Sequence, residues 1–536
     1  MRRTSLGYLV ITTALIAVTG IVGLGQTIGA NPDFDLTAAE EEAYWYSRYN
    51  LGHLTMRAGM GDVFMPNPEM VEMMISIADA DPDDGDTVSP PVNPALLRTV
   101  YAGGDPHWMQ TADPADFATM RWDPESFDRR ITGSALGWTI VKELEWAKQF
   151  HIDAHFGVPE DDFGAQWRFT GLVLTAMAKM QAAAWMDLHA AGEMVMVDDA
   201  DPFVMLMAIS NLAQLLGAEA MPHSDSNRYL DLEVAKMFRR VADEQFDRVI
   251  AMSTKEMSVK ELSTAAQGLV WYAAATRDAK RQALALERIE ALGLQLIAAP
   301  KNSAADIGYA LRGMMEAYRV TGCVECLHAS FDLLEELAVD FDEEHGIFRS
   351  QTTYTIDDVA AIVGGLNAVR LFGDADNRMV NRMLAGFFEG VVNLSGLQRS
   401  VPPIDSGKSL FEQDDPVIFY GYPGIPLPGE VDKFGAAPVF AASVTFDLDE
   451  GEWIEIDEGF DTAGAMHAAN EFIWLHADEV NGFPIVEPVA EMVMDGAEKE
   501  EVCFADDIDI PFGLIFLLGV FGVALAAMMS TCSTCK

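Results

Sequence analysis

The sequence predicts an all-α protein: an α/α toroid of about six helical hairpins, with a long irregular insertion and a C-terminal transmembrane helix. Three observations lead to this prediction. Long helical patterns follow one another from about residue 130. One hairpin plan recurs at a spacing of about 45 to 51 residues, which is typical of helical-repeat folds. The run Ile510–Met529 contains no charged residue and is long enough to span a bilayer.

The N-terminal segment, residues 1–30, has the pattern of a signal peptide or an uncleaved signal anchor. Arg2 and Arg3 precede an uncharged apolar run from Leu6 to Leu24, and small residues near Ala30 offer a cleavage site. Residues 31–130 then form a mixed region. Its first segment is expected to be helical, with Thr37 as the N-cap and Glu40 three residues later as its capping-box partner.

The repeat defines a ring domain over residues 131–500. The segments 321–350 and 372–400 share a glycine, a helix of about five turns, a second glycine and a closing Arg-Ser. A more apolar helix precedes each of them. Five such pairs follow residue 130, and residues 461–483 supply an inner helix for a sixth. We therefore expect a closed ring, with apolar helices inside and amphipathic helices outside, rather than an open solenoid.

Residues 401–460 interrupt the helical pattern. The first part is rich in proline and glycine, and a loop of this length in a compact domain is usually functional. The stretch 442–456, ASVTFDLDEGEWIEI, alternates apolar and polar residues on either side of Gly451 and predicts a short hairpin.

The hairpin at residues 308–348 resembles those of the α/α-toroid (six-hairpin) superfamily. The matching features are Thr321-Gly322 at a helix end, an acidic turn at residues 342–344, and Gly346 with Phe348. Six-hairpin glycosidases and the N-acylglucosamine 2-epimerase family share this hairpin, whose usual first-turn aromatic is replaced here around Cys326. The match is clear over residues 260–400. It implies the toroid fold but is not specific to one chemistry, so glycoside hydrolase, lyase and epimerase types all stay open.

Asp357 and Asp358 are the leading candidates for catalysis. They open an apolar helix after a polar loop, where loops of a toroid ring the mouth of its cavity. Two carboxylates can divide into a proton donor and a nucleophile or base. An aspartate at a helix start is also a common cap, and both readings stay open here. Asp306 and Asp461 occupy corresponding positions and are the alternates. Of the leading pair, Asp358 is expected to face the cavity.

The chain carries 83 acidic and 35 basic residues, a formal net charge of −48. Such a surface repels phosphate backbones, so binding to nucleic acid is not expected. It also suits salty surroundings, in which self-repulsion is screened. No metal or cofactor site is expected. Cys323 and Cys326 form a CxxC at a helix start, for which structural thiols and a local disulfide both fit.

The C-terminus predicts a transmembrane helix over residues 508–530 and a cytoplasmic tail over 531–536, which holds Cys532 and Cys535. Acidic residues precede the helix and Lys536 follows it, so the bulk of the chain is expected outside the membrane, periplasmic or at the cell surface. Two functions fit this picture. One is a membrane-tethered, carbohydrate-active enzyme. The other is a non-catalytic envelope protein that binds a glycan or a protein partner.

Overall fold

The computed structural model describes residues 34–79, 88, 96–111, 119, 121–156, 164–192, 197, 199–218, 227–373, 377–399, 436–476 and 482–489. Most of these residues lie in helices. Within these ranges, no helix is both long and apolar enough to cross a membrane. The two apolar runs Leu6–Leu24 and Ile510–Met529 lie outside them, so the predicted signal segment and membrane helix stay predictions.

Six helices form a closed inner ring. Each contacts the next in the order α3, α5, α7, α9, α11, α13, and α13 contacts α3 again. The inner helices are α3 (Gly133–Phe156), α5 (Asp201–Gly217), α7 (Val259–Ala275), α9 (Ala304–Thr321), α11 (Ile356–Phe372) and α13 (Thr462–His476). Helices buried on all sides are apolar all round, which explains their composition. The closed order confirms the predicted α/α toroid and the resemblance to that superfamily at the level of the fold.

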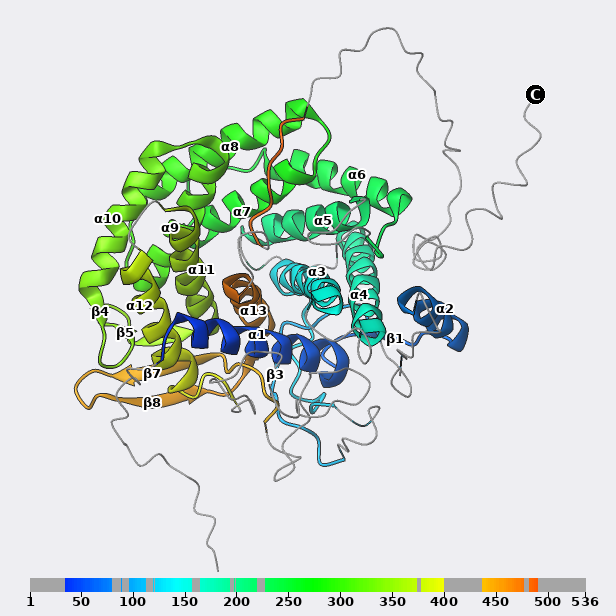
Figure 1. The fold of residues 1–536 in the computed structure, drawn as a ribbon, viewed down its shortest axis with the longest axis horizontal. Coiled ribbons are helices and arrows are strands. Elements are labelled where there is room, and N and C mark those ends of the chain that lie inside the picture. The colour runs from blue at the N-terminus through cyan, green and yellow to red at the C-terminus, as the bar shows by residue number, and fades with distance from the viewer. Residues whose placement is uncertain are drawn as a thin grey trace, which may run out of the picture.

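An outer helix packs against each inner one, and Figure 1 shows the outer helices surrounding the ring. The pairs, inner helix first, are α3 with α4, α5 with α6, α7 with α8, α9 with α10, α11 with α12, and α13 with α1. The outer helices are α4 (Gly164–Ala191), α6 (Leu232–Val249), α8 (Ala279–Ala298), α10 (Val324–Asp340), α12 (Asn377–Phe387) and α1 (Leu36–Gly52). The predicted division into apolar inner and amphipathic outer helices is confirmed for α6, α8, α10 and α12, which alternate buried and exposed positions, whereas the outer helices α1 and α4 are buried over most of their length.

The sixth hairpin joins the two ends of the described chain. The helix that begins at Leu36, expected in a mixed region, is α1, the outer partner of α13. Ser47 Oγ on α1 donates to the carbonyl of Ala469 on α13 at 2.7 Å, across a separation of 422 residues. The expected cap at Thr37 was wrong. Asp35 caps α1 instead, accepting a hydrogen bond from the Ala38 amide at 3.1 Å.

Short strands connect the helices at the edges of the ring. The pairs are β1 (Val63–Phe64) with β2 (Leu96–Leu97), β3 (Gly103–Gly104) with β9 (Phe460–Asp461), and β4 (Phe341–Asp342) with β5 (Ile347–Phe348). A three-stranded antiparallel sheet has the order β6 (Thr353–Thr355), β7 (Ser443–Asp447), β8 (Glu452–Asp457). The hairpin predicted within residues 442–456 is therefore confirmed as β7 and β8. Strands β6 and β9 lead directly into α11 and α13.

Three further elements complete the described fold. Helix α2 (Pro68–Ala78) packs on α4. Two π-helical turns, η1 (His53–Ala58) and η3 (Phe388–Asn393), extend α1 and α12. Cys323 and Cys326 are joined by a buried disulfide at the start of α10, one of the two alternatives left open by the sequence. Cys532 and Cys535 lie outside the described residues.

Helices α9 and α11 approach each other closely through glycine. A Cβ atom added at Gly365 would stand 2.3 Å from the carbonyl oxygen of Gly308, and one at Gly308 would stand 2.5 Å from the carbonyl oxygen of Ala361. Only residues without a side chain allow this backbone-to-backbone contact. This close approach lies next to Tyr309 on α9, whose hydroxyl reaches Asp357 in the first turn of α11.

Candidate functional site

The six inner helices begin at the same end of the ring, which we call the mouth. Contacts between neighbouring helix starts define it. The Ser134 amide donates to Asp201 Oδ1 at 2.8 Å, joining α3 to α5, and the Asp199 amide donates to Glu261 Oε1 at 3.2 Å, joining α5 to α7. All four acids singled out by the sequence lie in or next to first turns at this end. Their local geometry separates them.

Asp358 and Asp306 are capping residues. The Asp358 amide donates to Thr355 Oγ1 at 3.1 Å, and Asp358 Oδ2 accepts from the Thr355 amide at 2.9 Å, a complete capping box. Asp306 Oδ2 accepts from the Asn302 amide at 2.8 Å. The expectation that Asp358 faces the cavity was wrong. Thr355 is the N-cap, so Asp358 is the third helical residue and its side chain turns back to the cap.

Asp357 is the carboxylate that faces inward. It binds side chains from three other inner helices and is 19% exposed. Lys260 Nζ on α7 lies 3.0 Å from Oδ2, Tyr309 Oη on α9 donates to Oδ2 at 2.5 Å, and His467 Nδ1 on α13 lies 2.8 Å from Oδ1. Burial opposes ionisation here. Lys260, His467 and the Tyr309 hydroxyl outweigh it and hold the pKa of Asp357 well below its usual range. Asp357 is therefore an anion.

Asp461 lies beside Asp357. Its Oδ2 accepts from the Gly464 amide at 3.3 Å. A Cβ atom added at Gly464 would stand 2.6 Å from Asp461 Oδ2 and 3.3 Å from Asp357 Cβ, so this glycine leaves room for two neighbouring carboxylates. Asp461 is exposed as a residue, but its carboxyl group packs against protein. Burial, and then the negative charge of Asp357, raise the pKa of Asp461.

His467 is held in a fixed orientation beneath Asp357. Its ring stacks on Trp138 at a centroid distance of 4.3 Å and lies nearly parallel to Tyr309 at 6.0 Å. The side chain is 3% exposed. Its second ring nitrogen, Nε2, lies 3.8 Å from Oε1 of Glu471, one helical turn further along α13. The aromatic rings on both sides fix which carboxylate each nitrogen faces.

Sequence reasoning missed Lys260, Tyr309, His467 and Glu471. The signal that was available is their setting, because charged and polar residues are unusual on helices that are otherwise apolar. His467 and Glu471 stand at i and i+4 on α13 and therefore share one face. The acids at the helix starts were more conspicuous in the sequence. Aspartate is frequent there, however, because it caps helices.

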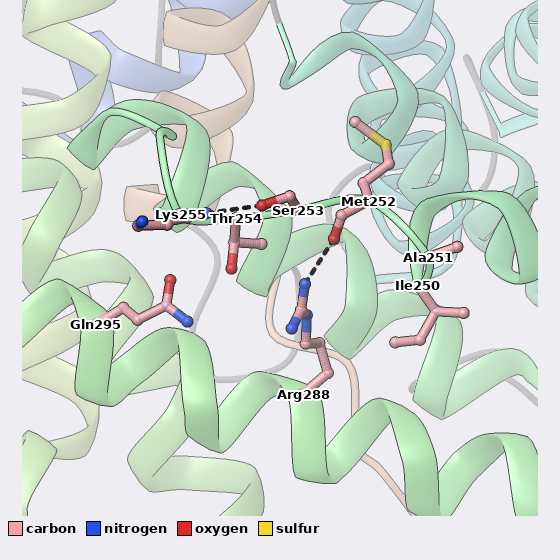
Figure 2. Close-up of a pocket in the computed structure, with 8 residues that line it drawn as sticks. All are labelled: Ile250, Ala251, Met252, Ser253, Thr254, Lys255, Arg288 and Gln295. Atoms are coloured by element: carbon pink, nitrogen blue, oxygen red, sulfur yellow. Dashed lines mark hydrogen bonds between the residues drawn. The ribbon is translucent and has the colours of Figure 1, made fainter.

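A pocket of about 550 Å³, which none of these carboxylates lines, lies between α8 and the loop that joins α6 to α7 (Figure 2). Arg288 crosses it and donates to the carbonyl of Met252 at 2.8 Å. The lining residues are Ile250, Ala251, Met252, Ser253, Thr254, Lys255, Arg288 and Gln295. They include no carboxylate, so this pocket offers no acid–base pair. Among the described residues, no group of three or more His, Cys, Asp or Glu side chains is arranged to hold a metal ion.

No family model and no curated protein matches the sequence significantly. Among solved structures, the chain is similar to the crystal structure of a mutant of unsaturated glucuronyl hydrolase from Streptococcus agalactiae, with a TM-score of 0.39 and 8% sequence identity. The superposition covers 77% of this chain and 91% of that chain.

Proposed function

We propose that this chain is an enzyme that acts on carbohydrate at the mouth of its toroid, with Asp357 and Asp461 as the catalytic carboxylates. One observation supports this above all: two neighbouring carboxyl groups have pKa values pushed in opposite directions. Such a pair divides acid and base roles at one pH. Asp461 keeps a proton more readily and is the proton donor, and ionised Asp357 is the base or nucleophile, as glycoside cleavage requires.

The charge of the mouth favours a neutral or amine-bearing sugar. The first turns of the inner helices, with the residue before α13, carry six acids and one lysine, Lys260. The acids are Glu261, Asp306, Asp357, Asp358 and Asp461, together with Asp201, which is buried. A uronate or sulfated chain would meet like charge there, whereas a neutral or cationic sugar would not. This supports neutral glycans and amino-sugar polymers as the substrate class.

The test is sugar release from a panel of neutral, amino and acidic glycans by the parent and by single variants. We expect activity on the neutral or amino class, and Asp357→Asn and Asp461→Asn should each lower the rate by about 100-fold or more, because asparagine cannot transfer a proton. Asp358→Asn and Asp306→Asn are matched controls, since asparagine still caps a helix. Equal rates in all four variants would show that Asp357 and Asp461 are not the catalytic pair. No release from any glycan would favour the non-catalytic envelope protein.

We also propose that residues 510–529 anchor the protein in a membrane, with the toroid on the extracytoplasmic side. The support is the uncharged run itself, the acids Asp506, Asp507 and Asp509 before it, and Lys536 after it. Truncation after Asp507 should move the protein from the membrane fraction to the soluble extracytoplasmic fraction. Retention in the membrane would show that the N-terminal apolar run holds the chain there, or that the toroid itself binds the membrane.

A further inference from the structure

A line of buried charged groups continues from Asp357 along the axis of the ring. Beyond His467, Glu471 Oε1 lies 3.6 Å from Nε of Arg312 on α9. Glu471 is 1% exposed, and neither of its carboxylate oxygens has a hydrogen-bond partner among the described residues. Burying a carboxylate is costly unless a countercharge or a proton compensates it. The position therefore needs an explanation beyond packing.

The surroundings of Glu471 leave it with few charged neighbours. Those that face it are Arg312 and Glu316 from α9 and His467 from its own helix. Helix α11 presents Gly364, where an added Cβ atom would stand 2.5 Å from the Glu471 carboxyl carbon. Helix α7 presents the neutral Gln267, which accepts from Arg312 at 3.4 Å. Burial raises the pKa of Glu471 against the opposing charges of Arg312 and His467.

We propose that Glu471 is a positioning residue that shares one proton with His467 and so controls the charge behind Asp357. In one state His467 is an imidazolium and Glu471 a carboxylate. In the other, the proton on Nε2 has moved to Glu471 Oε1, and the neutral imidazole keeps its Nδ1 proton toward Asp357. The total charge is the same in both states. The 3.8 Å gap exceeds a hydrogen bond, so transfer requires a rotation of the carboxyl group or one bridging water.

This inference rests on the proposed function for its purpose. When Asp357 is neutralised during a reaction, by a proton or by a bond to a sugar, the imidazolium of His467 loses its counter-ion. Passing the Nε2 proton to Glu471 then removes two buried charges in one step, which avoids the cost of an unpaired imidazolium. Glu471 would thus stabilise the site in both charge states without touching substrate.

Difference infrared spectroscopy on the full-length protein tests the proposal without any substrate. The spectrum of the parent minus that of Glu471→Gln isolates the C=O stretch of protonated Glu471, and its loss is followed as pH rises. The same difference is then measured in an Asp357→Asn background. Without the Asp357 charge the imidazolium is less stable, so the proton should stay on Glu471 to a pH about one unit higher or more.

Glu143 is the matched control. It is a fully buried glutamate on α3 that accepts from Gln181 Nε2 at 2.7 Å, and burial raises its pKa well above the usual range. Its band, isolated with Glu143→Gln, should not respond to Asp357→Asn.

If Asp357→Asn does not fold, His467→Gln replaces it and should also raise the midpoint of the Glu471 band. Equal midpoints in both backgrounds, or no protonated Glu471 band, would overturn the proposal. A shifted Glu471 band in a protein that cleaves no glycan would contradict the proposed function but support the shared proton.

Discussion

The two ends of the inner ring use the same helices in opposite ways. At the mouth, Asp357 and Lys260 are partly exposed, the lysine side chain by 43%. At the opposite end, here called the far end, residues 482–489 pack against α8 and α9, and Figure 1 shows them running past α7 and α8. There Arg312, 2% exposed, donates to the Gly482 carbonyl at 3.0 Å, and Arg319 donates to the Pro484 carbonyl at 2.8 Å.

This difference shows how one helix pattern serves stability at one end and chemistry at the other. The Phe483 ring lies over the Arg312 guanidinium at 3.8 Å, and Glu316 lies between Arg312 and Arg319, so these charged groups are covered by protein. Cation–carboxylate pairs occur at both ends. A buried pair leaves an uncompensated charge when one partner is removed, whereas an exposed pair is replaced by water. The pairs should therefore respond very differently to the same substitution.

The largest expected effect is on the far end. Arg312→Met keeps the apolar stem but removes the cation beside the buried Glu471, while Glu316 keeps Arg319, and it should lower the free energy of unfolding by about 3–5 kcal/mol. Lys260→Met at the mouth is the matched change and should cost less than about 1 kcal/mol, because water screens that pair. Denaturant unfolding of both variants measures the contrast. If Arg312→Met and Lys260→Met lower the free energy of unfolding by similar amounts, the proposed difference between the two ends is wrong.

A smaller effect separates the two adjacent aspartates at the mouth. Asp358→Ala removes a capping-box acceptor and should cost about 1 kcal/mol, while Asp358→Asn should cost little. Asp357→Asn keeps an acceptor for Tyr309 but removes the charge that faces Lys260 and the buried His467, so it should lower activity and cost more stability than Asp358→Asn. Thermal unfolding beside rate measurements checks this. A large stability loss for Asp358→Asn would contradict its assignment as a cap.

The smallest effect is a pH dependence at the seam where α1 closes the ring. Burial, opposed by a hydrogen bond from Asn393 at 2.6 Å and reinforced by Glu389, raises the pKa of Glu42 from 4.5 to about 7. Between these values the folded protein keeps a proton that the unfolded chain has released. The free energy of unfolding should therefore fall as pH rises through this window.

The pKa shift of Asp357 makes the free energy of unfolding depend on pH in the opposite direction. Its pKa is lowered from 3.8, so its contribution to stability is present above that value and is lost as pH falls. Glu42→Gln should flatten the pH dependence between 4.5 and 7, measured by denaturant unfolding at constant salt. If the free energy of unfolding depends on pH in the same way for the parent and Glu42→Gln across that window, a group other than Glu42 is responsible.

The sequence by itself determined the ring. Hairpin spacing and the contrast between apolar and amphipathic helices follow from burial, which acts on each segment separately, so inner and outer helices could be assigned one at a time. The alternation in residues 442–456 likewise predicted β7 and β8 from local pattern alone. Short-range physics also placed carboxylates at the helix starts, because capping depends on a few consecutive residues.

Only the tertiary structure decided which carboxylate carries the site and how the ring closes. One residue along a helix rotates a side chain by about 100°, so the choice between Asp357 and Asp358 depended on identifying Thr355 as the cap. His467 reaches Asp357 across 110 residues, and α1 reaches α13 across more than 400. Such contacts depend on how helices pack, through close approaches such as that of Gly308 and Gly365, and no local pattern records them.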